Sequence, residues 1–363
     1  MTIIEIESSR LKKIIKYADL ITGSDKSDPG MKLYFSEGLK IYATDGGIST
    51  HFKVNIESDD FSNIYDLHIP TLKLFLDKGF DDIPVYIKLN ETEAVFKFEN
   101  EILSLFQPSG SVIPEIPVFK TTGTVFFQEF INGINFASII MPENDYIYFF
   151  VRDGILFVIT IHNDFFTLYN SNTMFENMEI KIPYHNIRHF VKALSLIKNK
   201  DLKIGINLEE TKVAFQTSGI LTHICTELNS NEESLYLLEI LNLYDDLKPI
   251  GVVDFKTFKA ILAKISRISK NGNIELEIKN DDLIMSVKKK NLYYSSTEKM
   301  KEILSENIEN TVYSIHPGKI KSAIAKIEDD DIYIYSHHDF LCFGNSSKTK
   351  VLALKGKILE RGW

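Results

Sequence analysis

The chain has 363 residues, of which 44% are hydrophobic and 25% are charged, proportions that are ordinary for a globular protein with a sizeable core. Its formal net charge of −9 argues against a nucleic-acid partner unless the cations are concentrated on one surface. No apolar run reaches the ~18 residues that a bilayer span requires. The N-terminus also lacks a basic segment followed by an apolar run, so we expect a cytoplasmic protein with no membrane partner.

The first stretch of the chain predicts a short strand followed by a helix over residues 9–21. Apolar residues recur there at helical spacing, with cations between them; they are Leu11, Ile14, Ile15 and Ala18. A hairpin over residues 33–44 follows, with its turn at Glu37 and Gly38. The next residues, Thr44-Asp45-Gly46-Gly47, indicate a tight turn, because a phosphate-binding loop needs more glycines and a following helix.

A second helix is expected over residues 71–78, directly after Pro70. Proline suits the first turn of a helix, since its missing N–H would have no partner there. Two strands follow this helix. The segment over residues 106–118 contains three prolines, so we expect an extended edge segment that leads to a domain joint.

This order of elements recurs twice along the chain. Helices are expected over residues 127–141 and 184–197 in the second copy, and over residues 254–268 and from Pro317 in the third. The hairpins after the first helix of each copy turn at Asp153 and Gly154 and at Asp281 and Asp282. Internal repetition of this kind indicates tandem modules. We expect three domains, over residues 1–119, 120–248 and 249–363, and an α+β fold in which two helices pack on antiparallel sheet in each domain. The acidic, leucine-rich segment over residues 232–247 takes the position of a connector between the last two.

Cations are concentrated in the expected helices, where the acidic residues are only Asp19, Asp77, Glu129 and Asp254. Lysine and arginine are good helix formers and collect on solvated faces, which is one explanation. Because the bias recurs in related helices, we favour a basic surface that contacts DNA phosphates. The exception is the helix over residues 127–141, which has no basic residue. The predicted DNA-contacting residues are Arg10, Lys12, Lys13, Lys16, Lys73, Arg188, Lys192, Lys198, Lys256, Lys259, Lys264, Arg267, Lys319, Lys321 and Lys326.

Catalytic and metal-binding patterns are weak in this sequence. His337 and His338 are adjacent on an expected strand and point to opposite faces, which is poor for joint ligation. His185 and His189 have the i, i+4 spacing of a zinc pair but lack the glutamate of the metalloprotease pattern. The two cysteines, Cys225 and Cys342, make no metal-type spacing and read as reduced thiols. We therefore predict no catalytic residues, no metal and no cofactor, and hence a protein that is not an enzyme.

The order and spacing of these elements resemble the bacterial sliding clamp family, the beta subunit of DNA polymerase III. The resemblance covers the whole chain and is carried by the first helix, the run Ile41-Tyr42-Ala43-Thr44-Asp45, residues 104–116, residues 141–154, and Ile315-His316-Pro317 with its helix. It implies that each chain forms a half-ring and that two chains close head to tail into a homodimeric ring around double-stranded DNA. Inner cations would then hold DNA without reading its sequence. The runner-up interpretation is a clamp-fold interaction or regulatory protein that does not encircle DNA.

The resemblance also implies two protein contact sites. A groove that takes short peptides from polymerase and clamp-loader subunits would involve Thr160, His162, Phe165, Leu354 and Ile358. Its family pattern, a T-D-G-H-R-L-like run, is reduced here to the threonine and an apolar last residue. We also hypothesise that the five residues after Ile358 lie over this groove. The dimer interface would involve Leu74, Lys78, Ile102, Leu103, Leu292 and Tyr294.

Overall fold

The computed structural model describes residues 2–22, 31–35, 39–54, 64–77, 83–90, 92–106, 110, 112–140, 146–162, 165–197, 201–207, 209, 211–270, 272–279, 281–304, 312–327, 329–338 and 340–355. These residues form two compact units. The first unit combines Met1–Gln128 with His185–Glu227, and the second combines Glu129–Tyr184 with Leu228–Trp363. The predicted limits of three domains do not coincide with this division and remain a prediction.

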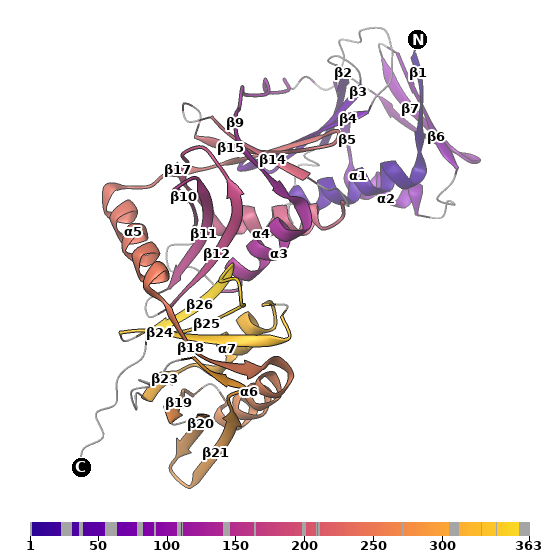
Figure 1. Ribbon diagram of the computed structural model, residues 1–363. Coiled ribbons are helices and arrows are strands. Elements are labelled where there is room, and N and C mark those ends of the chain that lie inside the picture. Colours follow the sequence, from indigo (N-terminus) through magenta and orange to yellow (C-terminus); the bar gives the residue numbers. More distant parts are fainter. Residues whose placement is uncertain are drawn as a thin grey trace. The chain divides into compact units, whose positions relative to one another are not determined.

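The first unit contains two antiparallel sheets (Figure 1). The four-stranded sheet has the order β1 (Thr2–Glu7), β6 (Pro84–Leu89), β7 (Glu93–Phe98) and β8 (Glu101–Phe106). The eight-stranded sheet has the order β5 (Tyr65–Leu67), β2 (Met31–Phe35), β3 (Leu39–Thr44), β4 (Ile48–Val54), β16 (Ile220–Cys225), β15 (Lys212–Thr217), β14 (Asp201–Asn207) and β9 (Lys120–Phe126). The β4–β16 pairing joins strands that are far apart in the sequence into one sheet.

The second unit also contains two sheets. The ten-stranded sheet has the order β17 (Glu227–Leu228), β13 (Glu179–Pro183), β10 (Tyr146–Arg152), β11 (Ile155–His162), β12 (Phe165–Met174), β26 (Lys350–Lys355), β25 (Phe340–Gly344), β24 (Asp331–His337), β18 (Lys248–Asp254) and β22 (Glu302–Ile303). The four-stranded sheet has the order β21 (Leu292–Lys299), β20 (Asp282–Lys289), β19 (Ile274–Lys279) and β23 (Val312–Ile315). The β12–β26 pairing again joins distant parts of the chain.

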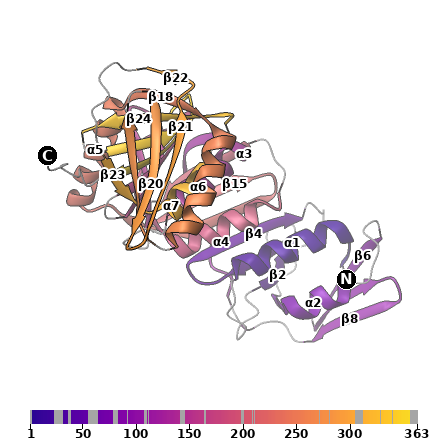
Figure 2. The same cartoon turned by 90° about the horizontal axis from the view of Figure 1, so that it is seen from below.

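Seven helices lie in the described part of the chain: α1 (Ser8–Ile21), α2 (Ile69–Leu76), α3 (Phe127–Ala137), α4 (Tyr184–Leu194), α5 (Asn231–Asp246), α6 (Phe255–Ser269) and α7 (Pro317–Ile324). Figure 2 shows α1 and α2 side by side in the first unit and α6 alongside β20 and β21 in the second. The helices pack through their apolar stripes, as the sequence period predicts. In α1 this stripe includes Leu11, Ile14, Ile15 and Ala18, all of which are buried.

The six helices expected from the sequence are present, with shifted ends. α2 begins at Ile69 and so includes Pro70 in its first turn. α4 ends at Leu194 instead of at residue 197, because Leu196 and Ile197 donate to carbonyls only three residues back, which tightens the last turn. α3 ends at Ala137 instead of at residue 141, and the amide of Ile139 likewise donates to Phe136.

The acidic connector segment over residues 232–247 forms a helix, α5. Ser230 caps it: its hydroxyl accepts from the Glu233 amide, and the Glu233 carboxylate accepts from the Ser230 amide. This reciprocal pair is a capping box, which satisfies two backbone donors at the helix start. The sequence pattern assigned this segment a position between two repeats but no secondary structure, which the structure supplies.

Of the three predicted hairpin turns, the structure confirms one and shifts another by one residue. Asp153 and Gly154 both have positive φ, as the tight hairpin turn requires, and this prediction is confirmed. The hairpin turn predicted at Asp281 and Asp282 lies one residue earlier in the structure, because Asp282 is already the first residue of β20. The turn at Glu37 and Gly38 lies outside the described residues. After β3, the Asp45 carboxylate accepts from the amides of Gly47 and Ile48, which is a structural role.

Candidate nucleic-acid interface

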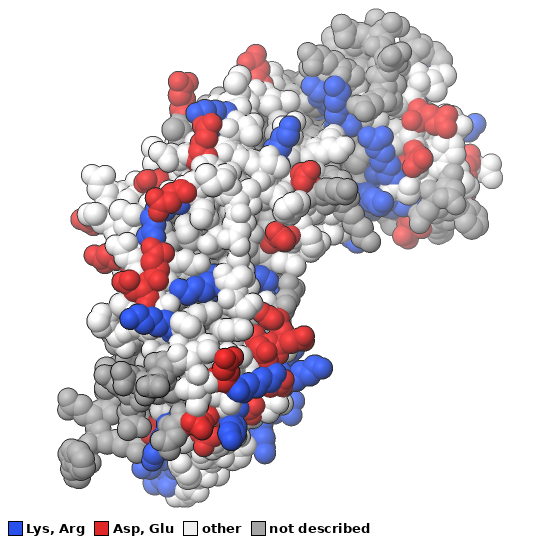
Figure 3. Space-filling view, in the orientation of Figure 1, with Lys and Arg blue, Asp and Glu red and all other residues white. Residues whose placement is uncertain are grey.

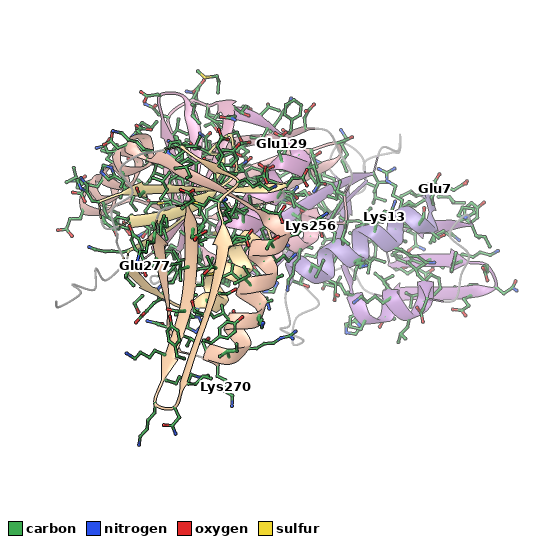
Figure 4. The ribbon with its side chains drawn as sticks, turned by 60° about the horizontal axis from the view of Figure 1, so that its bottom comes forward. Glu7, Lys13, Glu129, Lys256, Lys270 and Glu277 are labelled. Atoms are coloured by element: carbon green, nitrogen blue, oxygen red, sulfur yellow. The ribbon has the colours of Figure 1, made fainter. Side chains whose placement is uncertain are left out.

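The first group of candidate residues lies on α1. Arg10, Lys13 and Lys16 recur at three-residue spacing, and all three side chains are exposed, whereas Lys12 is half-buried. Figure 4 shows Lys13 extending from this helix. The opposite side of α1 is fixed to the eight-stranded sheet through Tyr17, whose ring meets Phe52 edge-on with centroids 5.2 Å apart. The buried stripe thus turns the cations of α1 to solvent.

Among the described residues of α2, Lys73 is the basic one. The ammonium of Lys73 lies 2.5 Å from the Asp19 carboxylate at the end of α1, and 47% and 39% of the two side chains are exposed. An exposed ion pair of this kind stabilises the fold little. It does neutralise part of the positive charge of Lys73, so this residue attracts phosphate less than Lys13 does. Lys78 lies outside the described residues.

α4 exposes Arg188 and Lys192, while Ile187, Phe190 and Leu194 are buried. His189 lies between the two cations on this helix. Burial lowers the pKa of His189 below its ordinary value, and Lys192 lowers it further. The ring is therefore neutral at pH 7, and the positive charge of α4 comes from its arginine and lysine. Lys198 lies outside the described residues.

α6 carries the largest set of exposed cations in the second unit: Lys256, Lys259, Lys264 and Arg267. Figure 4 labels Lys256 near its start and Lys270 just beyond its end, and Figure 3 shows basic side chains over this helix. Asp254 caps α6 by accepting from the Thr257 amide at 2.8 Å. The ammonium of Lys264 lies 5.2 Å from the centroid of the Tyr294 ring, within the range of a cation–π contact.

α7 and α3 complete the set of candidate helices. Lys321 and Lys326 are exposed on and just after α7, whereas the side chain of Lys319 lies outside the described residues. α3 has no cation, and Glu129 is exposed in its first turn. The positive charge is therefore uneven among the helices, as the sequence indicates.

The candidate groove residues on β11 and β12 of the ten-stranded sheet differ in burial: Thr160 is buried, whereas His162 and Phe165 are half-buried. Thr160 is fully buried, and its hydroxyl donates to the Ala137 carbonyl at 2.6 Å and also contacts Thr167. Its side chain is therefore covered by its neighbours, and its place in a peptide groove stays a prediction. The ring of His162 stacks on Phe165 at 4.7 Å.

Two other groove candidates come from the end of the chain. Phe165 is paired with Leu354 in the β12–β26 register, and Leu354 is 4% exposed. The sheet thus brings His162, Phe165 and Leu354 together although they are far apart in the sequence. Ile358 and the residues after it lie outside the described part of the chain, so the hypothesis that they cover the groove stays a prediction.

The described candidate dimer residues lie on one helix and two edge strands: Leu74 on α2, Ile102 and Leu103 on β8, and Leu292 and Tyr294 on β21. β8 ends the four-stranded sheet of the first unit, and β21 ends that of the second, as far as the described residues show. Exposed apolar side chains mark both regions: Leu74 is 75% exposed, Ile102 67% and Leu292 46%. Leu103 and Tyr294 are half-buried. Tyr293, beside Leu292 on β21, is 68% exposed.

The remaining candidates from the sequence are the histidines His337 and His338 and the thiol of Cys342. The expectation that His337 and His338 point to opposite faces of a strand is wrong: β24 ends at His337, His338 has positive φ, and the two ring centroids lie 4.2 Å apart in an edge-on arrangement. Within the described ranges, no group of three or more metal-ligating side chains is close enough to hold an ion. Cys342 is buried, and burial raises the pKa of its thiol above the ordinary value. None of the helices in the described ranges has the length and apolarity to cross a membrane.

Comparison with known proteins identifies the fold. No protein-family model and no curated protein sequence matches the chain. Among solved structures, DNA polymerase III subunit beta from Pseudomonas aeruginosa is 11% identical, with a TM-score of 0.81 over 99% of this chain and 100% of that one. The DNA polymerase sliding clamp from Bacillus subtilis is 14% identical, with a TM-score of 0.79 over 98% of this chain and 99% of that one. The DNA polymerase III beta subunit from Thermotoga maritima is 12% identical, with a TM-score of 0.79 over the same shares.

These matches define the class first: the chain has the α+β fold of a sliding clamp, and the predicted fold class of tandem helix-and-sheet modules is confirmed. Within that class, the structures it matches are those of the bacterial DNA polymerase III beta subunit, so the resemblance found in the sequence is confirmed as well. The identities of 10–14% make it a divergent form of that fold.

Proposed function

We propose that this protein is a DNA sliding clamp: a ring-shaped processivity factor that encircles duplex DNA and tethers the replicative polymerase. Two copies join head to tail, and the cationic helices of each copy face the DNA. The protein has no catalytic role of its own. It acts in the cytoplasm.

One observation carries this proposal above the others. In a chain with a net charge of −9, the helices α1, α4 and α6 bury their apolar stripes and expose cations on the opposite side. Lysine and arginine side chains that contact phosphates hold DNA without reading bases, because the backbone carries no sequence information. Such contacts suit a protein that moves along the duplex.

The proposed ring closes through the free edges of β8 and β21. An edge strand with exposed backbone groups and apolar side chains is a template for pairing with another chain. Pairing β8 of one copy with β21 of the other would extend both four-stranded sheets and cover Ile102 and Leu292. A closed head-to-tail arrangement of this kind is a permitted symmetric assembly. In this proposal, the three domains begin at residues 1, 120 and 249.

The partner peptides are proposed to bind around His162, Phe165 and Leu354. The His162 and Phe165 rings stack, and the neighbouring strand contributes Leu354. A short apolar segment of a polymerase or clamp-loader subunit would contact this apolar and aromatic surface. Thr160 supports it from below through its bond to α3.

A second candidate function is a clamp-fold regulatory protein that binds partners without encircling DNA. The observation that favours it is the uneven charge, because α3 has no cation and exposes Glu129, and Lys73 is paired with Asp19. A protein with this role would bind DNA weakly and run as a single chain.

Retention on circular DNA separates these two functions. The protein is loaded onto a nicked circular plasmid by a clamp loader, the salt is raised to dissociate electrostatic complexes, and retained protein is measured after gel filtration. A sliding clamp stays on the circle and leaves when a restriction enzyme cuts it, because the link is topological. Loss from the intact circle at high salt, together with a mass of 41.6 kDa in solution, would favour the regulatory protein.

A further inference from the structure

The helix α5 covers one face of the ten-stranded sheet of the second unit (Figure 1). Its inner side buries Leu237, Ile240, Leu241 and Tyr244 against the aromatic residues of that sheet. The Tyr244 hydroxyl donates to the Lys348 carbonyl at 2.9 Å. This one apolar face is sufficient to hold a surface helix on a sheet.

Polar contacts at both ends fix α5 in place. At its start, Glu233 completes the capping box and forms an ion pair with Lys181 at 3.0 Å. At its end, the Arg152 guanidinium contacts the Asp245 carboxylate and donates to Asn242 at 3.3 Å. The helix is therefore anchored, and its outer surface is presented in a defined orientation.

The outer side of α5 carries a second apolar stripe. Leu235 is 63% exposed and Leu238 is 37% exposed. They are three residues apart and flanked by the exposed Asn231 and Asn242, four residues away on either side. This alternation of four and three is the spacing of a coiled-coil seam, in which apolar residues meet a partner helix, although the Asn242 carboxamide already accepts from Arg152. Neither leucine belongs to the buried cluster that holds α5 on its own sheet.

A row of carboxylates runs beside this seam. Glu232, Glu239 and Asp246 are exposed and spaced by seven residues, so they lie on one side of the helix at the flanking positions of the same heptads. Figure 3 shows acidic side chains over α5, and the helix contains no lysine or arginine. Flanking charges of one sign select a partner with charges of the opposite sign.

We propose that the outer face of α5 is a docking site for a cationic amphipathic helix of a partner protein. Its apolar residues contact Leu235 and Leu238, and its lysines or arginines lie beside Glu232, Glu239 and Asp246. A second copy of this chain does not fit, because antiparallel pairing of two such helices would place their carboxylates against one another. An anionic lipid surface is disfavoured for the same reason. The site lies within the second unit and does not depend on whether the protein encircles DNA.

A designed peptide tests the site directly. The probe is a 21-residue fluorescein-labelled helix with leucine at the seam positions and lysine at the flanking positions, and its control has the same composition in scrambled order. Binding to the full-length protein is measured by fluorescence anisotropy at 0.15 M salt. We expect the patterned peptide to bind at least tenfold more tightly than the scrambled one. The double variant Leu235→Ser, Leu238→Ser should weaken its binding at least tenfold.

A charge exchange gives an independent readout. The double variant Glu232→Lys, Glu239→Lys should lose affinity for the lysine peptide and gain affinity for a version with glutamate at the flanking positions. A matched control, Val112→Ser with Glu115→Lys, changes an exposed valine and an exposed acid in the first unit and should leave binding unchanged.

Three results would overturn the proposal. The first is equal binding of the patterned and scrambled peptides, and the second is unchanged binding by both α5 variants. The third is a concentration-dependent increase in mass that disappears in the leucine variant, because it would assign this face to a second copy of the chain. Circular dichroism checks that each variant keeps its fold, which we expect because the changed side chains are exposed.

Discussion

His51 lies in a buried cluster of rings on the eight-stranded sheet of the first unit. The Tyr34 hydroxyl lies 3.0 Å from its Nδ1 atom, and the Tyr42 and His223 rings have centroids 4.9 Å and 5.7 Å away. Burial, His223 and Lys40 together lower the pKa of His51 to about 3. The folded protein therefore keeps this imidazole neutral over a pH range in which the unfolded chain takes up a proton.

This difference predicts a pH dependence of stability. The contribution of His51 is fully present above its unfolded pKa of 6.5 and is lost as the pH falls below that value, since protons then bind preferentially to the unfolded chain. At pH 5 the free energy of unfolding should be lower by roughly 2 kcal/mol from this group. Urea unfolding at pH 7 and pH 5 measures it, and His51→Gln should reduce the difference. The exposed His68 is the matched control, and equal pH dependence of His51→Gln and His68→Gln would contradict the assignment.

The cations of the candidate interface differ in what they contact. Lys13 is exposed, whereas Lys73 is paired with Asp19. Under the proposed DNA-binding function, Lys13→Ala should therefore reduce the slope of log K against log salt by about 0.9 for one lost phosphate contact, and Lys73→Ala should reduce it less. Fluorescence anisotropy with a short duplex over a salt series measures both. A larger change for Lys73→Ala would indicate that the ion pair opens when DNA binds.

Among the helices, α3 contains a glycine in its interior whose role the sequence leaves open. A Cβ atom built on Gly133 would lie 2.4 Å from ring carbons of Tyr169, which is far inside van der Waals contact. Replacing a mid-helix glycine by alanine ordinarily stabilises a helix by about 1 kcal/mol. Here the buried ring occupies the space that the methyl group needs, so the glycine allows α3 to lie close to β12.

We therefore predict that Gly133→Ala destabilises the protein. Overpacking of a core costs about 1 to 3 kcal/mol, which outweighs the gain in helix propensity. The free energy of unfolding in urea should fall, and the second change Tyr169→Leu, which removes the ring, should recover part of the loss. A stabilised single variant would show that Tyr169 moves aside at little cost.

The elements also show how far the sequence predicts this molecule. The helical period located α1, α2, α3, α4, α6 and α7, because each has one apolar face. The helical period of apolar residues did not identify α5, because this helix has apolar residues on two sides. Ser230 and Glu233, which form its capping box, were a sequence signal for its start. The exposure of Arg10 and Lys259 could be predicted from the helical period of the apolar residues around them. The burial of Thr160 and the Lys73–Asp19 ion pair could not, because both arise from contacts between segments that are distant in the sequence.

At the scale of the whole molecule, the edge strands β8 and β21 decide the proposed assembly. Ile102 lies on β8 and is 67% exposed. A glutamate there would place a charge in the proposed contact, so Ile102→Glu should convert the dimer into a chain of 41.6 kDa and abolish retention on circular DNA. Light scattering coupled to gel filtration measures the mass.

The matched control for this variant is Val112→Glu, since Val112 is also exposed, at 84%, but lies outside the strands. It should leave the mass unchanged. A dimer that persists in Ile102→Glu would show that the chains associate through another surface.

The β4–β16 and β12–β26 ladders have a consequence for how such a chain can be divided. A fragment cut after residue 119 would keep β4 but lose the strand that pairs with it, and one that begins at residue 249 would keep β26 without β12. Each cut would bare a row of amide and carbonyl groups in the middle of what had been continuous sheet. The repeats therefore look separable in the sequence, yet each covers a strand edge of its neighbour. A fragment with that edge unpaired could add strands from other copies and aggregate.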